Sequence, residues 1–309
     1  MTTHTALRLM TAVLVTSLFA GALVSAQGQM LPSTPKKAFG ASISPAYDGW
    51  YDNADGTHTF LIGYYNRNWT AEVDVPIGPE NHFEPGNPDR GQPTHFRPNR
   101  GFGVFTITVP KETPATEKLW WVLTVNGVTQ RVPFHRSPDY NITPQQASEE
   151  SPGGKYNTPP VLRFSENGPA IQNPVASLSS AIERVATVGV PMRVDFFVED
   201  DALYASGSNA PLSDAPRIVE IVVGKYRGSG GVTVAKDHET MTTVKGGKPA
   251  EPYAGKTSTT VSFSQPGDYL LHVTVNDLSG PGGGATGCCW TTSLIKVAVK
   301  GTMPPPTGR

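Results

Sequence analysis

The residues best suited to acid–base or metal chemistry gather in one long stretch, residues 76–101. It is rich in proline and glycine and carries four such side chains: His82, Glu84, Asp89 and His95. Imidazole and carboxylate groups can shuttle protons or hold a metal ion when they converge on one point. Their spacing is a poor ligand pattern, however, and neither HExxH nor GxSxG occurs in the chain. We therefore expect a solvated loop, and a hydrolase using this loop is the weakest alternative function.

Aromatic side chains are concentrated in the first half of the chain, which holds four of the five tryptophans. Tyr65 and Trp120 fall out of phase with the inward residues of their predicted strands, and Trp69 follows shortly after Tyr65. Rings on the outside of a sheet can stack on sugars or contact a partner protein. Ordinary pairing on the sheet surface is the plainer interpretation. The alternative is a glycan-binding face that uses Tyr65, Trp69 and Trp120.

The chain has only two cysteines, Cys288 and Cys289, which are adjacent. Neighbouring Cα atoms lie about 3.8 Å apart across a trans peptide, whereas a disulfide usually joins Cα atoms roughly 4.4–6.8 Å apart. We therefore expect two thiols. If the alternation of the last strand extends back from Ile295, Cys289 faces the core, whereas Cys288 and Trp290 face out. Cys288 is then a candidate reactive thiol, and the plainer interpretation is two small apolar residues packed beside Trp290.

Composition favours strands over helices and excludes some classes of partner. The 309 residues include 32 glycines and 29 prolines, and only 17% are charged. Frequent glycine and proline suit short strands joined by tight turns. The formal net charge is -1 and no block of like charges occurs, so nothing in the sequence would hold a nucleic-acid backbone. We expect a mainly β protein that does not bind nucleic acid.

The N-terminus has the pattern of an export signal. Arg8 precedes an uncharged, largely apolar run, residues 9–26, which ends in Val24, Ser25 and Ala26. This ending suits a signal peptidase, so we expect a signal peptide over 1–26 and a leader over 27–40. An uncleaved anchor is the alternative, because the run approaches the roughly 17 residues that can span a bilayer. The protein is expected to be secreted, periplasmic or on the cell surface, without membrane insertion after signal removal.

The elements that must position these residues are strands. In the first half, apolar residues alternate over 58–66, 102–110 and 118–132, and Asn126 and Gly127 lie between two apolar runs. Asn-Gly is the strongest short hairpin signal because both residues tolerate positive φ. We predict an antiparallel β-sandwich domain over 41–136. Residues 137–160 lose all periodicity and hold five prolines, which predicts a stiff linker.

The second half, residues 161–301, shows the same alternation in several segments. The clearest is 266–277, where Tyr269, Leu271, Val273 and Val275 point to one side. The others are 189–201, 218–226, 257–263 and 291–299. We predict a second antiparallel β-sandwich domain, followed by a flexible tail over 302–309. Apolar residues spaced near one helical face also predict a short helix within 174–188.

The strand order and turns of this second half resemble a known domain. The segments that carry the resemblance are VGVPMRVDFFVEDD, KYRGSGGVTV, TTVSFSQPGDYLLHVTVND and a last strand that ends in IKVAV. Together they resemble the immunoglobulin-like domain of the polycystic-kidney-disease type, the PKD domain, over about 161–300. The resemblance implies an extracellular spacer or interaction module with no chemistry of its own. We find no such resemblance for the first half.

Acidic residues end two strands of this PKD-like half. Asp200 and Asp201 close one predicted strand, next to Glu199, and Asp277 closes another, next to Asn276. In an immunoglobulin-like topology these strands run the same way, so their carboxyl ends meet at one pole. Calcium takes roughly six to eight oxygen ligands, and such a pole offers several. Calcium held by Asp200, Asp201 and Asp277 is the one candidate cofactor. The plainer expectation is soluble turns with no cofactor.

These observations favour an all-β, non-enzymatic protein of two antiparallel β-sandwich domains joined by a proline-rich linker. The expected function is binding or spacing at the cell surface or in the periplasm. The partner is expected to be a protein or a glycan that the sequence does not identify. A polysaccharide-binding accessory module acting through the first domain is the alternative function.

Overall fold

The computed structural model describes residues 37–144, 157–201, 205–206, 210–211, 219–235, 238–241, 252–277 and 289–301, which belong to one compact unit, Lys37–Arg309. The predicted signal peptide, the predicted tail, Cys288 and parts of the predicted leader and linker lie outside the described residues. Within those ranges every regular element is a strand or a three-residue 3-10 helix. None of the described helices has the length and apolar character needed to span a bilayer.

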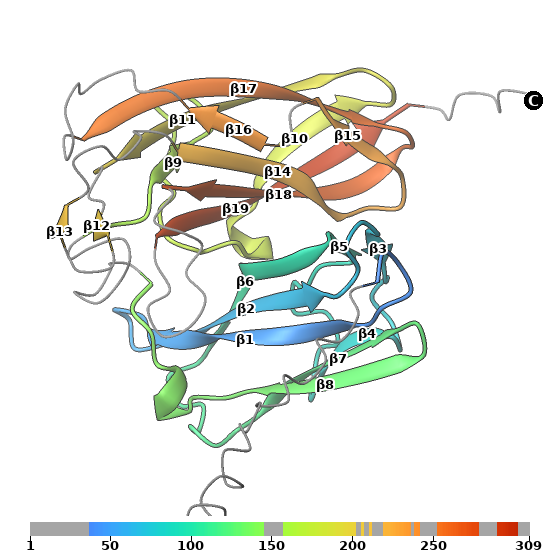
Figure 1. The fold of residues 1–309 in the computed structure, drawn as a ribbon, viewed down its shortest axis with the longest axis vertical. Coiled ribbons are helices and arrows are strands. Elements are labelled where there is room, and N and C mark those ends of the chain that lie inside the picture. The colour runs from blue at the N-terminus through green and yellow to red at the C-terminus, as the bar shows by residue number, and fades with distance from the viewer. Residues whose placement is uncertain are drawn as a thin grey trace, which may run out of the picture. The chain divides into compact units, whose positions relative to one another are not determined.

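The first part of the chain forms two antiparallel three-stranded sheets (Figure 1). One sheet has the order β1-β2-β6, with strands Ile43–Asp52, His58–Asn66 and Asn99–Val109. The other has the order β4-β7-β8, with strands Asn81–Glu84, Leu119–Val125 and Val128–Phe134. Two short strands, β3 (Val73–Asp74) and β5 (His95–Phe96), pair with each other. Asn126 and Gly127 connect β7 to β8 with φ of 52° and 75°, which confirms the predicted hairpin.

Alternating side chains of these two sheets form a common core. Phe60 and Ile62 of β2 lie in one hydrophobic cluster with Trp121 and Leu123 of β7, and all four are at most 2% exposed. Phe83 of β4 stacks on Trp121 with ring centroids 5.6 Å apart. Full burial of each such side chain contributes about 1.5–3 kcal/mol. Two sheets packed face to face in this way make the first sandwich.

The second part of the chain forms a sandwich of two larger sheets. One has the order β15-β17-β11-β9 and the other the order β10-β19-β18-β14-β16. The strands are β9 (Val161–Arg163), β10 (Ile182–Thr187), β11 (Met192–Asp200), β14 (Val219–Arg227), β15 (Val232–Val234), β16 (His238–Met241), β17 (Tyr253–Phe263), β18 (Gly267–Asn276) and β19 (Trp290–Lys300). The small pair β12 (Ala205–Ser206) and β13 (Ala210–Pro211) lies outside both sheets.

The strand order of this second sandwich is immunoglobulin-like. One sheet joins the positions A, B, E and D of an immunoglobulin fold, and the other joins the positions C, F and G, with β10 parallel to β19 at its edge. Tyr269, Leu271, Val273 and Val275 of β18 are at most 1% exposed and share a cluster with Phe196 of β11. The all-β prediction and the alternation in β18 are therefore confirmed.

The short helix predicted within 174–188 is wrong. The structure has a single 3-10 turn, Leu178–Ser180, followed by strand β10. Leu178 and Val185, which suggested an apolar helical face, are 45% and 62% exposed. The helical spacing was therefore accidental, because β10 gains its backbone partners from β19 rather than from its own turns.

Residues 76–101 were predicted to be one solvated loop, and this prediction is wrong in part. The stretch contains β4, β5 and the first residues of β6. Buried Asn81 organises it: the side-chain amide donates to the carbonyls of Val75 and Pro93 at 2.9 and 2.8 Å and accepts from Trp121 Nε1 at 2.9 Å. A buried amide that replaces backbone pairing leaves no periodic signal in a sequence.

Candidate functional site

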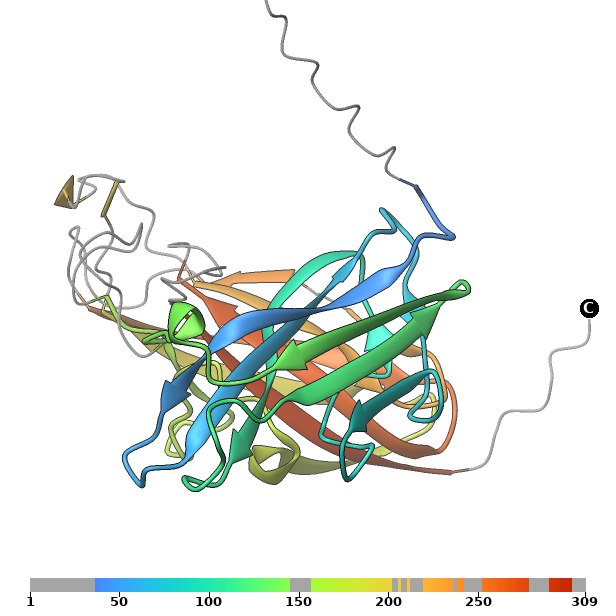
Figure 2. The same ribbon diagram turned by 90° about the horizontal axis from the view of Figure 1, so that it is seen from below.

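The two sandwiches meet across a buried interface. The hydrophobic cluster of the first sandwich continues into four residues of the second: Ala176, Tyr226, Leu270 and Leu294. The backbone N–H of Thr106 donates to the Ala176 carbonyl at 2.9 Å. Figure 2 shows strands of the first sandwich crossing over the orange and red strands of the second. The interface, rather than the linker alone, holds the two sandwiches together.

A bulge in β14 builds one end of this interface. The register between β14 and β18 shifts between Lys225 and Arg227, so Tyr226 joins the hydrophobic cluster of the first sandwich. The Tyr226 hydroxyl donates to the Gly91 carbonyl at 2.5 Å. Arg227 forms a two-point ion pair with Asp89, at 2.9 and 2.8 Å. Part of the stretch predicted as a free loop is therefore docked on β14.

The start of β19 builds the other end of the interface. Trp290 is fully buried in a cluster with Tyr51, Leu61 and Ile142. A Cβ added at Gly103 would lie 2.5 Å from Trp290 Cζ2, and Gly103 has a φ of 48°. Glycine is the residue that suits both this narrow space and this backbone conformation.

A buried ion pair lies in the first sandwich near Gly103. Asp48 sits where the register of β1 and β2 shifts, and its carboxylate accepts the Gly103 N–H at 2.7 Å and pairs with Arg100. Arg100 also donates to the Tyr64 carbonyl at 3.0 Å. Burial raises the pKa of Asp48 to about 6, although Arg100 and the Gly103 N–H act to lower it.

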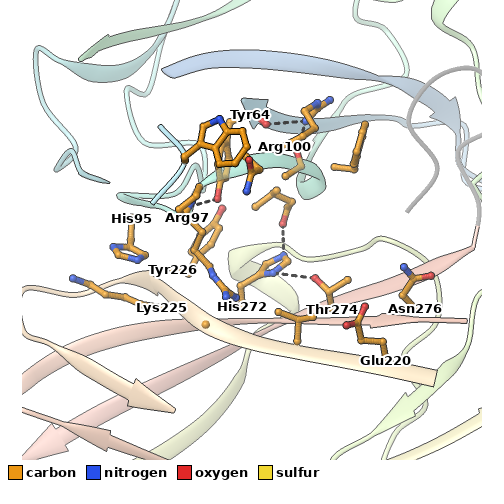
Figure 3. A pocket seen from close by; sticks show the side chains of 18 residues that line it. Tyr64, His95, Arg97, Arg100, Glu220, Lys225, Tyr226, His272, Thr274 and Asn276 are labelled. Atoms are coloured by element: carbon orange, nitrogen blue, oxygen red, sulfur yellow. Dashed lines mark hydrogen bonds between the residues drawn. The ribbon is translucent and has the colours of Figure 1, made fainter. Parts of the chain in front are cut away.

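A cavity of about 550 Å³ opens between the sandwiches, within the roughly 300–1,000 Å³ typical of small-ligand sites. The first sandwich contributes side chains that include Trp69, Arg97, Asn99 and Arg100. The second contributes side chains that include Glu220, Lys225, Thr274 and Asn276. Figure 3 shows Arg100 on the opposite side of this space from Glu220, Thr274 and Asn276. Any ligand here would contact both sandwiches.

His272 of β18 forms part of the cavity wall as a neutral imidazole. Its Nε2 lies 2.8 Å from the Val104 carbonyl, and Thr274 Oγ1 lies 3.3 Å from its Nδ1. Because a carbonyl only accepts, Nε2 carries the proton and Nδ1 accepts from Thr274. Burial lowers the pKa of His272 to about 4. His272 therefore bridges the two sandwiches without adding charge near neutral pH.

The rim of the cavity beside β5 is a network of ion pairs. His95 Nδ1 lies 2.9 Å from Asp74 Oδ1, and His95 Nε2 lies 3.3 Å from Glu72 Oε2. Lys225 donates to the same Asp74 oxygen at 3.1 Å. A second hollow of about 410 Å³ adjoins this rim and also involves Arg97. The network links β3 and β5 of the first part of the chain to β14 of the second.

The four residues suggested for hydrolysis do not form one site. His82 and Glu84 lie on β4, where Glu84 pairs with Arg131 at 2.7 Å, whereas Asp89 is held by Arg227. His95 is held by Asp74 and Glu72 at the cavity rim. Within the residues that the structure describes, no group of three or more His, Cys, Asp or Glu side chains is arranged to hold a metal ion.

The three aromatic residues suggested for binding are not brought together. Trp69 is 53% exposed and lines the cavity. Tyr65 is 39% exposed with the Arg67 guanidinium 5.2 Å from its ring centroid. Trp120 is half-buried on β7, beneath Arg131 at 3.7 Å. Tyr65 and Trp120 belong to different sheets and point out of the first core, so they lie on opposite faces of the sandwich.

Two of the three acidic residues suggested for calcium, Asp201 and Asp277, accept hydrogen bonds from the end of the linker. Asp201 accepts from the backbone and the hydroxyl of Thr158 at 2.8 and 2.7 Å. Asp277 is fully buried and accepts from Asn157 at 2.7 Å. Asp200 is 5% exposed at the end of β11. These contacts tie the end of the linker to the pole of the second sandwich, and the calcium site stays a prediction.

The expectation of two thiols is wrong for Cys289, which is disulfide-bonded and fully buried. Its burial matches the predicted inward orientation. The Cys289 sulfur lies 3.4 Å from the Asn157 carbonyl oxygen. The candidate reactive thiol, Cys288, lies outside the described residues. Trp290 points out of the second core, as alternation indicates, but it is fully buried because the first sandwich covers it.

Sequence reasoning missed most residues of the cavity. Arg97 and Arg100 lie in the 76–101 stretch, but neither they nor Lys225 and His272 were suggested as site residues. Lys225 and Tyr226 lie beside a bulge, which alternation does not reveal. Polar His272, Thr274 and Asn276 alternating with apolar residues along β18 look like an ordinary solvent face. The one sequence signal was that Arg97 and Arg100 lie in an unusually long loop near Trp69.

Comparison with known proteins gives no family. No family model and no curated protein matches the sequence. Solved structures that align with it include a protein of unknown function from Porphyromonas gingivalis W83, at 8% identity and TM-score 0.20, covering 84% of this chain and 100% of that one. Domains 4 and 5 of the S-layer protein SbsC align at 12% identity and TM-score 0.21, and the alignment covers 84% of this chain and 98% of that one. The D00-D0 domain of Intimin aligns at 8% identity and TM-score 0.22, and the alignment covers 83% of this chain and 100% of that one. TM-scores this low do not establish a shared fold, so the fold assignment rests on strand order alone.

Proposed function

We propose that the protein is a non-enzymatic binding module whose ligand occupies the cavity between the two sandwiches. One observation carries this proposal: the ring of Trp69 is 53% exposed at a cavity of about 550 Å³ that both sandwiches line. A large exposed aromatic ring beside convergent polar groups is the usual composition of a binding site. The sandwiches supply a fixed frame, and the ligand would bridge them.

The contacts of the charged cavity residues support binding rather than catalysis. Arg100 is held by Asp48 and the Tyr64 carbonyl, and Lys225 is held by Asp74. His272 is buried, neutral and oriented by hydrogen bonds to both sandwiches. A general base needs a pKa near the working pH and must lie within hydrogen-bond distance of the substrate proton that it removes. The pKa of His272, about 4, lies well below that range.

Several finer assignments belong to the same proposal. The domain boundaries 41–136 and 161–301, the PKD type of the second sandwich, export from the cytoplasm and a place at the cell surface or in the periplasm remain predictions from the sequence. The immunoglobulin-like strand order supports a PKD-type domain but does not distinguish it from related sandwiches.

A binding screen with matched variants tests the proposal. The full chain is applied to arrays of glycans and of surface proteins, and Trp69→Ala is compared with Tyr65→Ala. Tyr65 is a suitable control because it is also exposed but does not line the cavity. We expect Trp69→Ala to lose the ligand with an unchanged melting temperature and Tyr65→Ala to keep it. Equal binding by both variants would show that the cavity is not the site.

A rigid spacer is the second candidate function. Its support is the interface itself, where Arg227 pairs with Asp89 at one end and Trp290 packs against Gly103 at the other. A spacer of this kind is expected to unfold in one cooperative calorimetric transition, with both sandwiches melting together. Two separate transitions would mean that the interface does not couple the sandwiches, and the spacer function would lose its basis.

A further inference from the structure

We infer that two copies of the chain associate edge to edge through β10, which pairs antiparallel with itself about a two-fold axis at Val185. This inference goes beyond the proposed function, because no residue of β10 lines the cavity between the sandwiches. It rests on the backbone groups, the exposed side chains and the charges of this one strand, Ile182–Thr187. The dimer would present two such cavities, one from each copy.

β10 is an edge strand with an open side. Among the described strands it pairs with β19 alone, at the end of the five-stranded sheet, and the parallel register runs through all six residues without a shift. The backbone N–H of Val188 donates to the Lys300 carbonyl at 2.9 Å, so the backbone groups of even-numbered residues face β19. Because these groups alternate in direction along a strand, those of Glu183, Val185 and Thr187 face the open side.

Val185 has an N–H and a carbonyl available on that side. No described residue hydrogen-bonds to either group. At the two neighbouring positions the N–H groups are open in the same way, whereas each carbonyl already has one donor. The Glu183 carbonyl accepts from the exposed Arg184 guanidinium at 2.9 Å, and the Thr187 carbonyl accepts from the Val190 N–H at 3.1 Å. A carbonyl can accept two hydrogen bonds, so this edge is a template for another strand.

β10 lacks features that commonly protect an edge strand from association. Such strands often contain a proline, a bulge or an outward charge, and β10 has neither proline nor bulge. The carboxylate of Glu183 is already paired with Lys296 of its own sheet at 3.3 Å. Val185 is 62% exposed, and Leu178 and Val190, which flank the strand, are 45% and 54% exposed. The open edge is therefore accompanied by apolar surface.

The charges of β10 favour a second copy in one register. Antiparallel self-pairing with the axis at Glu183 or at Arg184 would place like charges directly opposite each other, which is unfavourable. With the axis at Val185, Val185 faces itself and Glu183 faces Thr187 of the second copy. All three outward positions then form hydrogen-bonded pairs. Because the strand is complementary to its own sequence, a second copy fits it better than an unrelated chain does.

The same axis gives an apolar row across the joined sheets. Ala298 of β19 lies beside Val185 in the register of the two strands, so Val185 and Ala298 of both copies form one row. Leu178 precedes β10 and Val190 follows it, so antiparallel pairing brings Leu178 of one copy towards Val190 of the other. A contact through six residues is smaller than a standard interface of about 1,600 Å², so we expect a weak dimer with a Kd in the roughly micromolar range.

Cysteine cross-linking of the full chain tests the axis directly. Hydrogen-bonded partners in an antiparallel pair have Cα atoms about 5.5 Å apart, within the roughly 4.4–6.8 Å that a disulfide spans. We therefore expect Val185→Cys to form a covalent dimer on mild oxidation. The matched control is Val128→Cys, because Val128 is 44% exposed on β8 of the first sandwich. The unmodified protein shows any cross-linking through the native cysteines.

Sedimentation equilibrium measures the dimer without a cross-link. The unmodified chain is expected to shift reversibly from monomer to dimer as its concentration rises. Val185→Lys places two ammonium groups opposite each other at the axis and should raise the Kd of the dimer roughly tenfold or more, whereas Val128→Lys should leave it unchanged. Val185→Pro removes an N–H that the pairing with β19 does not use, so it should weaken the dimer with little change in the melting temperature of the monomer.

Several results would overturn the inference. A monomer at every concentration up to the limit of solubility would exclude the dimer. A dimer that both Val185→Lys and Val185→Pro leave intact would use another surface. Equal cross-linking of Val185→Cys and Val128→Cys would place the axis elsewhere. If the chain is monomeric and Val185→Lys loses a protein captured on the array, the edge takes a strand of that protein and not of a second copy.

Discussion

Two buried groups, His272 at the interface and Asp48 in the first sandwich, are expected to give opposite responses to acid. His272 has a pKa of about 4 in the folded protein, against an ordinary value of 6.5. Its contribution to stability is complete above pH 6.5 and is lost as the pH falls towards 4, because the unfolded state takes up the proton first. The difference corresponds to about 3 kcal/mol in the free energy of unfolding, at about 1.4 kcal/mol for each pH unit.

Asp48 acts in the other direction. Its pKa is raised from 3.8 to about 6 in the folded protein. The folded state therefore binds the proton more tightly, so stability is gained as the pH falls below about 6 and is complete below 3.8. This gain is about 3 kcal/mol in full, of which about 2 kcal/mol is reached by pH 4. The two contributions nearly cancel between pH 6.5 and pH 4.

Single variants should separate the two contributions. His272→Gln keeps a donor for the Val104 carbonyl and an acceptor for Thr274, but it cannot be protonated. Relative to the unmodified protein, its free energy of unfolding should rise by about 3 kcal/mol between pH 7 and pH 4. The free energy of unfolding of Asp48→Asn, relative to the unmodified protein, should fall by about 2 kcal/mol over the same interval. Other titrating groups cancel because each variant is compared with the unmodified protein at the same pH.

Urea unfolding followed by tryptophan fluorescence measures these differences. Opposite trends of the stated size would support the burial of His272 at the interface and of Asp48 beside Gly103. If neither difference changes between pH 7 and pH 4, then His272 and Asp48 titrate normally in the folded protein. The surroundings of both groups would in that case be hydrated rather than buried.

Three further predictions concern the interface and the pole of the second sandwich. Gly103→Leu should lower the free energy of unfolding by about 2–4 kcal/mol, because the new side chain would collide with Trp290 and would have to adopt a positive φ. An unchanged urea midpoint would show that Trp290 does not pack there. Arg227→Met should lower the free energy of unfolding by about 1.5–3 kcal/mol, because Asp89 loses its two-point partner. The control is Arg193→Met, which removes an exposed ion pair and should change the melting temperature little. If the predicted calcium site exists, EDTA lowers the melting temperature and added calcium restores it, whereas an unchanged melting temperature removes the site.

Alternation in the sequence predicted the parts of the fold whose stability depends on one buried face. Tyr269 to Val275 of β18 and Phe60 and Ile62 of β2 point inward as expected, because a strand between core and surface must bury every second residue. The Asn126–Gly127 turn was equally clear, since few residues tolerate two successive positive φ values.

The cavity was not predictable in the same way. Tyr226 reaches the first sandwich because of a bulge, and a one-residue shift in register has no signature in residue type. Asp48 also sits at a register shift. Trp290 was placed outside by alternation, which is right for an isolated sandwich but wrong for one that is covered by a neighbour. An interface between two sandwiches depends on contacts far apart in sequence, so periodicity within each strand does not reveal it.

Protection of Trp69 from a soluble quencher tests the central claim most directly. Trp69 is 53% exposed, Trp120 is half-buried beneath Arg131, and Trp50, Trp121 and Trp290 are at most 8% exposed, so acrylamide quenching should report mainly on Trp69. We predict that a saturating concentration of the ligand identified by the array screen lowers acrylamide quenching of the full chain and has no such effect on Trp69→Phe. Binding of that ligand with unchanged quenching of the unmodified protein would place it elsewhere and contradict the assignment of the cavity as the site.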